Sequence, residues 1–197
     1  LLGGHIWDWK DQGLARYDEY GVKSWGYGGD YERDTDPNSG NFCCNGIVSP
    51  DGTPKPAMWT CKYVYQPVEF TMLDKEELRL SLKNRNFHRS TEGYAYSWEI
   101  KDEDGLIQNG DLDVPVMAPG ESVEVSVPAK KMSFKPGAVY MLNLYSKESA
   151  ALPYAASGHC HSSEQFVLNE RVQPEVPSAK GKVPAVSESE KEICIKA

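Results

Sequence analysis

A chain of 197 residues, of which 40% are hydrophobic and 25% charged, has the composition of a globular protein and is long enough for one domain and part of another. Its net charge of −8 argues against a nucleic-acid partner, which needs a basic face, and suits a neutral ligand such as a sugar. No apolar run approaches the roughly 20 residues of a membrane span, so no membrane partner is predicted.

The first third of the chain predicts one strand, one long loop and one helix. Residues 1–7 are predicted to form a buried strand, and a polar, glycine-rich loop follows from about Asp8 to Thr53. A helix is predicted from Pro54 or Lys55 to Gln66, with Thr53 as its N-cap. A single unit of this kind cannot cover both faces of its strand. We therefore expect it to belong to a larger domain that begins before residue 1.

From Val68 to Leu168 the apolar side chains recur with a period of two, which indicates strands with one buried face. Tyr94, Tyr96 and Trp98 illustrate the pattern, because polar residues alternate with them. Seven short strands within roughly 100 residues are typical of an immunoglobulin-like β-sandwich, and Trp98 is its predicted core aromatic. The predicted strands are residues 68–73, 78–82, 94–100, 106–114, 123–127, 139–145 and 164–168.

The last residues have a different composition. Residues 173–192 are rich in Pro, Ser, Lys and Glu, which is typical of an extended linker, and a further strand is predicted to begin at Ile193. The five cysteines lack paired spacing, so we expect free thiols and no zinc site. His159 and His161 would share one face of a strand, but for them we favour a structural role over a metal site.

A sugar site is one interpretation of the motif Gly3-Gly4-His5-Ile6-Trp7-Asp8-Trp9. An indole can cover the apolar C–H face of a pyranose, while neighbouring carboxylates and amides bind its hydroxyl groups. The other interpretation places Trp7 and Trp9 in the core of a strand, and without further information that one is favoured.

Five blocks of sequence, in order, resemble the β-galactosidases of glycoside hydrolase family 2. The first resembles the last strand of the catalytic barrel, and the others resemble the loop and helix that follow it in this family. The blocks are Gly3–Leu14, Tyr27-Gly28-Gly29-Asp30-Tyr31, Pro37–Ile47 with its Asn41-Phe42-Cys43-Cys44-Asn45-Gly46, Asp51-Gly52-Thr53-Pro54-Lys55-Pro56-Ala57, and Lys62–Gln66.

The resemblance implies a division of the chain into three parts. Residues 1–66 would be the C-terminal end of the (β/α)8 barrel, residues 67–172 the immunoglobulin-like domain 4, and residues 173–197 a linker and the start of the next β domain. The fold class is therefore mainly β, with a sandwich preceded by a truncated terminal βα unit of a TIM barrel.

The resemblance also implies the activity of the whole enzyme, which is hydrolysis of terminal β-D-galactose residues with retention. Both catalytic glutamates of the family lie upstream of the Gly-Gly-x-x-Trp strand, so no catalytic residue is assigned here and the chain alone is predicted to be inactive. The acids Asp8, Asp11, Asp30 and Asp36 are expected to be solvated in a polar loop, without a catalytic role.

For binding, the resemblance implies that Trp7 and Asn38 contact substrate. It also implies that the Phe42 carbonyl and the Asn45 side-chain oxygen hold part of a sodium site. The whole enzyme would use Na⁺ and Mg²⁺, although the chain alone has no complete cofactor site. The implied partners are a β-galactoside and the remaining domains of the enzyme. A homo-oligomer is compatible with this assignment, in the cytoplasm or periplasm of a bacterium.

One alternative comes from a different class of protein, namely a stand-alone β-sandwich that binds carbohydrate or has a structural role. It requires Tyr94, Tyr96 and Trp98 to be exposed. A further expectation follows from the barrel assignment: residues 1–66 should pack on the sandwich, with the helix around Trp59 as an adaptor, or pair with another copy of the chain.

Overall fold

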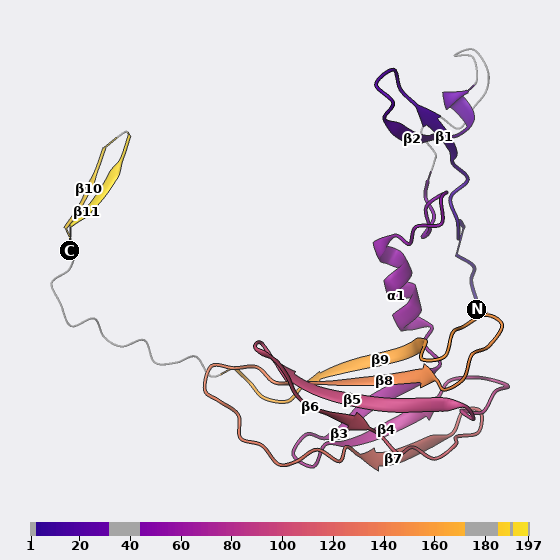
Figure 1. Cartoon of the computed structure of the whole chain (residues 1–197), viewed down its shortest axis with the longest axis vertical. Helices are drawn as coiled ribbons and strands as arrows, with labels where there is room; N and C mark the ends of the chain where they lie inside the picture. Colours follow the sequence, from indigo (N-terminus) through magenta and orange to yellow (C-terminus); the bar gives the residue numbers. More distant parts are fainter. Residues whose placement is uncertain (1–2, 32–43, 172–184, 190, 197) are drawn as a thin grey trace.

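A β-sandwich forms the main body of the molecule in this computed structural model, which describes residues 3–31, 44–171, 185–189 and 191–196 (Figure 1). One sheet has three strands in the order β3-β4-β7, and the other has four in the order β6-β5-β8-β9. All pairs are antiparallel. The strands are β3 (Val68–Asp74), β4 (Arg79–Asn84), β5 (Tyr94–Asp102), β6 (Gly105–Asp111), β7 (Ser122–Ser126), β8 (Met141–Glu148) and β9 (Cys160–Val167).

The apolar faces of the two sheets meet in one core. On β5 the buried residues alternate with half-buried or exposed ones, as a pleated strand with one face inward requires. Trp98 is only 3% exposed, and its indole Nε1 donates a hydrogen bond to the Asp111 carbonyl at 3.2 Å. The other fully buried apolar side chains are Val68, Leu80, Leu82, Ile100, Met117, Leu142 and Leu144.

The seven predicted strands are confirmed, with differences of a few residues at their ends. The buried aromatic face of β5 also decides between the two classes of protein. Tyr96 and Trp98 are buried and Tyr94 packs against the same core, so this face cannot serve as an exposed sugar platform. The interpretation as a stand-alone binding module required this face to be exposed, so the structure does not support it.

The helix α1 (Pro56–Val64) joins the sandwich to the N-terminal part of the chain. It is shorter than predicted, and Lys55 rather than Thr53 is its N-cap residue. The Tyr63 hydroxyl donates to the Glu164 carboxylate on β9 at 2.7 Å. Just after the helix, the buried Gln66 accepts a hydrogen bond from the Ser163 N–H at 3.0 Å. These bonds fix the base of the helix on the edge strand of the larger sheet.

The prediction of a buried strand at the N-terminus is wrong for the residues that the structure describes. Residues 3–9 form no strand, and Trp7 is 85% exposed. The physical reason is that a barrel strand is stable only between neighbouring strands, and the described part of this chain offers it none. The helix does dock on the sandwich as expected, but residues 3–7 do not, and pairing with a second copy is untested.

A short hairpin lies within the long loop, which the sequence did not predict. It pairs β1 (Leu14–Tyr17) with β2 (Lys23–Gly26) and is followed by the 3-10 helix η1 (Gly28–Asp30). Its turn is closed by Asp18, whose side chain accepts hydrogen bonds from the N–H groups of Tyr20 and Val22. The hairpin lies at the far end of the arm formed by residues 3–31 and 44–64 (Figure 1).

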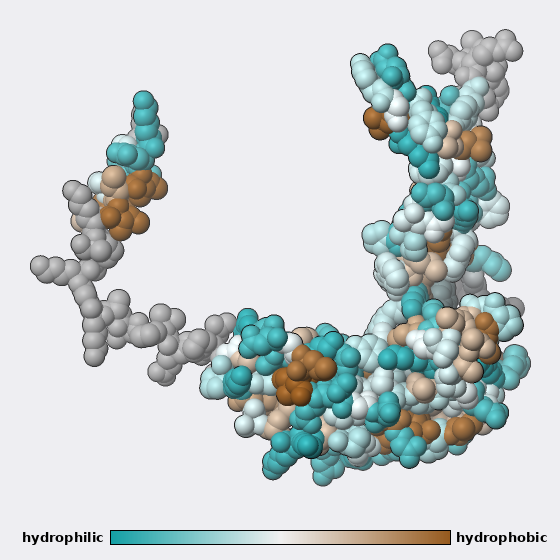
Figure 2. Space-filling model, viewed as in Figure 1, coloured by the Kyte–Doolittle hydropathy of each residue, from teal (hydrophilic) through white to brown (hydrophobic). Residues whose placement is uncertain are grey.

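A second hairpin ends the chain, pairing β10 (Ala185–Glu188) with β11 (Ile193–Lys196). The predicted strand at Ile193 is confirmed, whereas residues 185–188, predicted to be linker, form a strand. Val186, Ile193 and Ile195 are exposed, and Figure 2 shows the hydrophobic surface on this hairpin. Among the described residues, no helix has the length and hydrophobicity that a membrane crossing requires.

Candidate functional site

The candidate site lies on the arm, where the segment that carries Trp7 meets the segment that carries Asn45. The backbone joins the two segments directly: the N–H groups of Ile47 and Val48 both donate to the Trp9 carbonyl, at 3.2 and 3.0 Å. The Asp11 N–H returns a bond to the Val48 carbonyl at 2.9 Å. Residues far apart in the loop are therefore neighbours in space.

Asp11 is the buried polar centre of this junction. Its side chain is fully buried, and one carboxylate oxygen accepts the Gly46 N–H at 2.6 Å. The other oxygen lies 2.6 Å from the Lys55 ammonium nitrogen. The expectation that this acid would be solvated is wrong, because its side chain is buried. The sequence does not reveal this burial, since Gly46 and Lys55 lie far from Asp11 along the chain.

Gly46 occupies a position where no side chain fits. A Cβ atom added there would lie 2.8 Å from the Asp8 carbonyl oxygen and 2.8 Å from the Asp11 carboxylate. Only glycine permits such a close approach of two backbones. Gly46 directly follows Asn45, and Asp8 directly follows Trp7. The close approach of Gly46 to Asp8 therefore lies one residue from each of them in the sequence. The Trp7–Asp8 peptide bond is cis.

The structure describes two of the four predicted binding residues, Trp7 and Asn45, and backbone hydrogen bonds join the segments that follow them. Trp7 and Asn45 are both exposed and lie on the adjacent segments. Asn38 and Phe42 lie outside the described residues, as does Asp36. Asp11 and Lys55, which hold the segments together, were missed as site residues. The only signal in the sequence was that each lies within a block shared with the family.

The Tyr-Gly-Gly-Asp-Tyr block packs on the hairpin that precedes it. Asp30 accepts a hydrogen bond from the Arg16 guanidinium at 2.8 Å and another from the Tyr27 N–H at 3.0 Å. The Tyr31 hydroxyl donates to the Leu14 carbonyl at 3.2 Å. The acid of this block therefore has a structural role in joining η1 to β1.

A cavity of about 480 Å³ separates the arm from the sandwich. Aromatic and apolar side chains of the arm form one wall, including Trp9, Met58 and Trp59, and His159 and His161 form part of the other. The His161 ring packs on Tyr94 with centroids 4.1 Å apart. Among the described residues no group of three or more His, Cys, Asp or Glu side chains is arranged as metal ligands would be.

Burial lowers the pKa of His161 to about 4, an effect that the nearby Glu148 carboxylate partly opposes. The folded state therefore keeps this imidazole neutral, while the unfolded chain takes up a proton near pH 6.5. Because the unfolded state binds more protons between those values, stability should fall as the pH falls from about 6.5 to 4. His161→Phe, which keeps a ring against Tyr94, should flatten this dependence in urea unfolding. Equal slopes in both chains would contradict the assignment.

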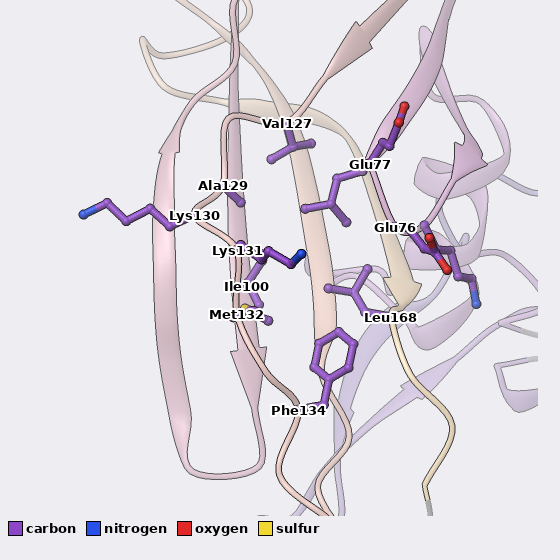
Figure 3. A pocket seen from close by; sticks show the side chains of 12 residues that line it. Glu76, Glu77, Ile100, Val127, Ala129, Lys130, Lys131, Met132, Phe134 and Leu168 are labelled. Carbon is purple, nitrogen blue, oxygen red and sulfur yellow. The ribbon is translucent and has the colours of Figure 1, made fainter.

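A second cavity, of about 650 Å³, lies at one end of the sandwich (Figure 3). Its lining includes Ile100, Val127, Phe134 and Leu168, together with lysine and glutamate side chains. Lys130 extends away from it in Figure 3. It contains one aromatic ring and no tryptophan, so it lacks the paired aromatic and amide groups that make a sugar site.

Two family models match separate parts of the chain. Residues 1–70 match the family model for the TIM barrel domain of glycosyl hydrolases family 2, and residues 80–169 match the model for domain 4 of β-galactosidase. The two matches define the class as the glycosyl hydrolases of family 2, from which the chain contains part of the TIM barrel domain and domain 4. Within that class, the chain belongs to the β-galactosidases of glycoside hydrolase family 2.

Among its relatives are β-galactosidases of several bacteria. The chain is 34% identical to the β-galactosidase of Aeromonas hydrophila over 168 residues, which are 85% of this chain and 16% of that protein. It is 31% identical to β-galactosidase 2 of Enterobacter cloacae over 97% of this chain and 18% of that protein. It is 32% identical to the β-galactosidase of Priestia megaterium over 98% of this chain and 18% of that protein. The chain therefore spans less than a fifth of the length of these three relatives.

Proposed function

We propose that this chain forms part of an enzyme that hydrolyses terminal β-D-galactose residues with retention, called the complete enzyme below. Residues 1–66 would complete the catalytic barrel, residues 67–172 would be a scaffold domain, and residues 173–197 would lead into the next β domain. The observation that supports the proposal is the backbone junction between the segment that follows the exposed Trp7 and the segment that follows Asn45. Active-site loops of such barrels lie at the C-terminal ends of the strands.

Trp7 would bind the sugar and transfer no proton. Its indole is 85% exposed, so its face is available to the C–H face of a galactosyl ring. Asn38 would hydrogen-bond the sugar hydroxyl groups from the same loop. The two carboxylates that such a reaction requires, about 5–5.5 Å apart in a retaining enzyme, would come from the rest of the barrel.

A sodium ion beside the sugar is part of the proposal. Hard cations take oxygen ligands, and Asn45 offers an amide oxygen on an exposed residue between two anchored neighbours. Asn45 would supply its side-chain oxygen and Phe42 its carbonyl, and the ion would help to orient the sugar. The complete enzyme would use magnesium as well.

Trp7→Ala tests the proposal in the complete enzyme. We expect kcat/KM for an aryl β-galactoside to fall at least about tenfold, because a truncated aromatic anchor typically costs 1.4 kcal/mol or more of binding. Trp7→Phe should recover part of the loss. Trp59→Ala, which removes an indole from the cavity between arm and sandwich, is the matched control and should leave kcat/KM within about threefold. Equal activity of Trp7→Ala and the unchanged enzyme would refute the assignment.

A further inference from the structure

The Asp11–Lys55 pair holds both sides of Asn45. The Lys55 ammonium donates to the Cys44 carbonyl at 2.6 Å, and the Asp11 carboxylate accepts the Gly46 N–H at 2.6 Å. The two side chains are also 2.6 Å from each other. The turn Cys44–Gly46, called the Asn45 turn below, is therefore fixed by one ion pair that grips the peptide group before Asn45 and the one after it.

The backbone conformation of the Asn45 turn depends on these two hydrogen bonds. Cys44 has a φ of 58°, a left-handed conformation that a residue with a Cβ adopts only at a cost. The Gly46 backbone lies so close to the Asp8 carbonyl oxygen that an added Cβ atom would be 2.8 Å from it. Released from its two anchors, the backbone would relax away from this arrangement, and the side chain between them would lose its direction.

The burial of the pair makes it sensitive to substitution. The Asp11 side chain is 0% exposed and that of Lys55 is 28% exposed. Removing one partner of a buried ion pair leaves an uncompensated charge and is far more damaging than breaking an exposed one. The chain contains a natural comparison on the sandwich, where Lys101 lies 2.6 Å from Glu99 but the two side chains are 39% and 28% exposed.

We propose that Asp11 and Lys55 are positioning residues that set the Asn45 turn for cation binding beside the Trp7 segment. This inference rests on the proposed function, because it assigns to Asn45 a place at the sodium ion. It adds a device that acts through Asn45 without touching substrate. The consequence is specific: weakening the pair should weaken cation binding more than it slows the chemical step.

Lys55→Met is the first test, and two measurements read it out. In the 197-residue chain, the amide proton of Gly46 should exchange at least about tenfold faster, because its acceptor is no longer fixed. In the complete enzyme, the sodium concentration for half-maximal activity should rise at least about tenfold, while kcat at saturating sodium stays within about threefold. Lys55→Arg keeps the charge and should restore both values to within about threefold.

The controls separate a positioning role from general damage. Lys101→Met breaks the exposed pair of the same length and should change neither measurement. If Lys55→Met does not fold, the double variant Asp11→Asn, Lys55→Met removes both charges and should fold with the same weakening of sodium dependence. Faster Gly46 exchange with unchanged sodium dependence would overturn the inference, because the pair would then be structural only. An unchanged enzyme that needs no sodium would instead overturn the proposed sodium site, and this inference with it.

Discussion

Trp98→Ala should destabilise the sandwich by about 3–5 kcal/mol, the usual cost of truncating a buried tryptophan. The indole is 3% exposed in the centre of β5, and Gly110 on β6 lies against its ring, where a Cβ would be 3.2 Å from Nε1. Because Gly110 has no side chain, β6 offers no side-chain atoms at this position that could fill the cavity left by the indole. Because small domains are stable by only 5–15 kcal/mol, much of the folded population should be lost at elevated temperature.

Trp7→Ala is the matched control for that result. It makes the same chemical change at a side chain that is 85% exposed, so the free energy of unfolding should change by less than about 0.5 kcal/mol. Urea unfolding followed by circular dichroism measures both variants, since it does not depend on tryptophan fluorescence. Similar losses in the two variants would contradict the assignment of Trp98 to the core and of Trp7 to the surface.

The second large effect is an absence of turnover. The purified 197-residue chain should not hydrolyse an aryl β-galactoside, whereas the complete enzyme should do so at rates typical of enzymes. General acid catalysis and nucleophilic attack each need a positioned carboxyl group, and the resemblance places both upstream of residue 1. Asp11, the most deeply buried acid of the arm, already has partners for both oxygens.

A positive result would have to be traced to this chain. Turnover that persists through purification and disappears on Asp8→Asn or Asp30→Asn would show that the arm contains its own catalytic acid. Turnover that survives both substitutions would indicate a contaminating enzyme. In that case, the same chain purified from a host that lacks β-galactosidase should be inactive.

The sandwich was predictable because its signal is local. Each strand alternates apolar and polar side chains, and the alternation on β5 at Tyr96, Trp98 and Ile100 is the pattern of a strand with one buried face. Several turns between the strands contain glycine, and Gly105 and Gly120 adopt a positive φ that glycine reaches without steric cost. No distant residue has to be known to assign these elements.

The arm was harder to predict because its structure depends on partners far away in the sequence. The β1–β2 hairpin has strands of four residues, and seven of these eight residues are exposed or half-buried, so no apolar period reveals them. The buried state of Asp11 comes from Gly46, which is 35 residues away, and from Lys55. A strand at residues 1–7 was predicted from its composition, yet a strand of that kind needs neighbours on both sides.

The site itself was predictable only through the resemblance. Taken alone, Trp7 and Asn45 are an exposed tryptophan and a residue in a turn, and both are common in proteins without a sugar site. What the structure adds is the junction of the segments that follow them, through the hydrogen bonds to Trp9 and the close approach at Gly46.

A crystal structure of the complete enzyme with galactose bound would show directly whether Trp7 and Asn45 lie at the sugar. We expect carbon atoms of the sugar within about 4 Å of the Trp7 indole face, and the Asn45 side-chain oxygen at a sodium ion beside it. Galactose bound on the sandwich, or in the active site with Trp7 directed away from the sugar, would contradict the proposed role of Trp7.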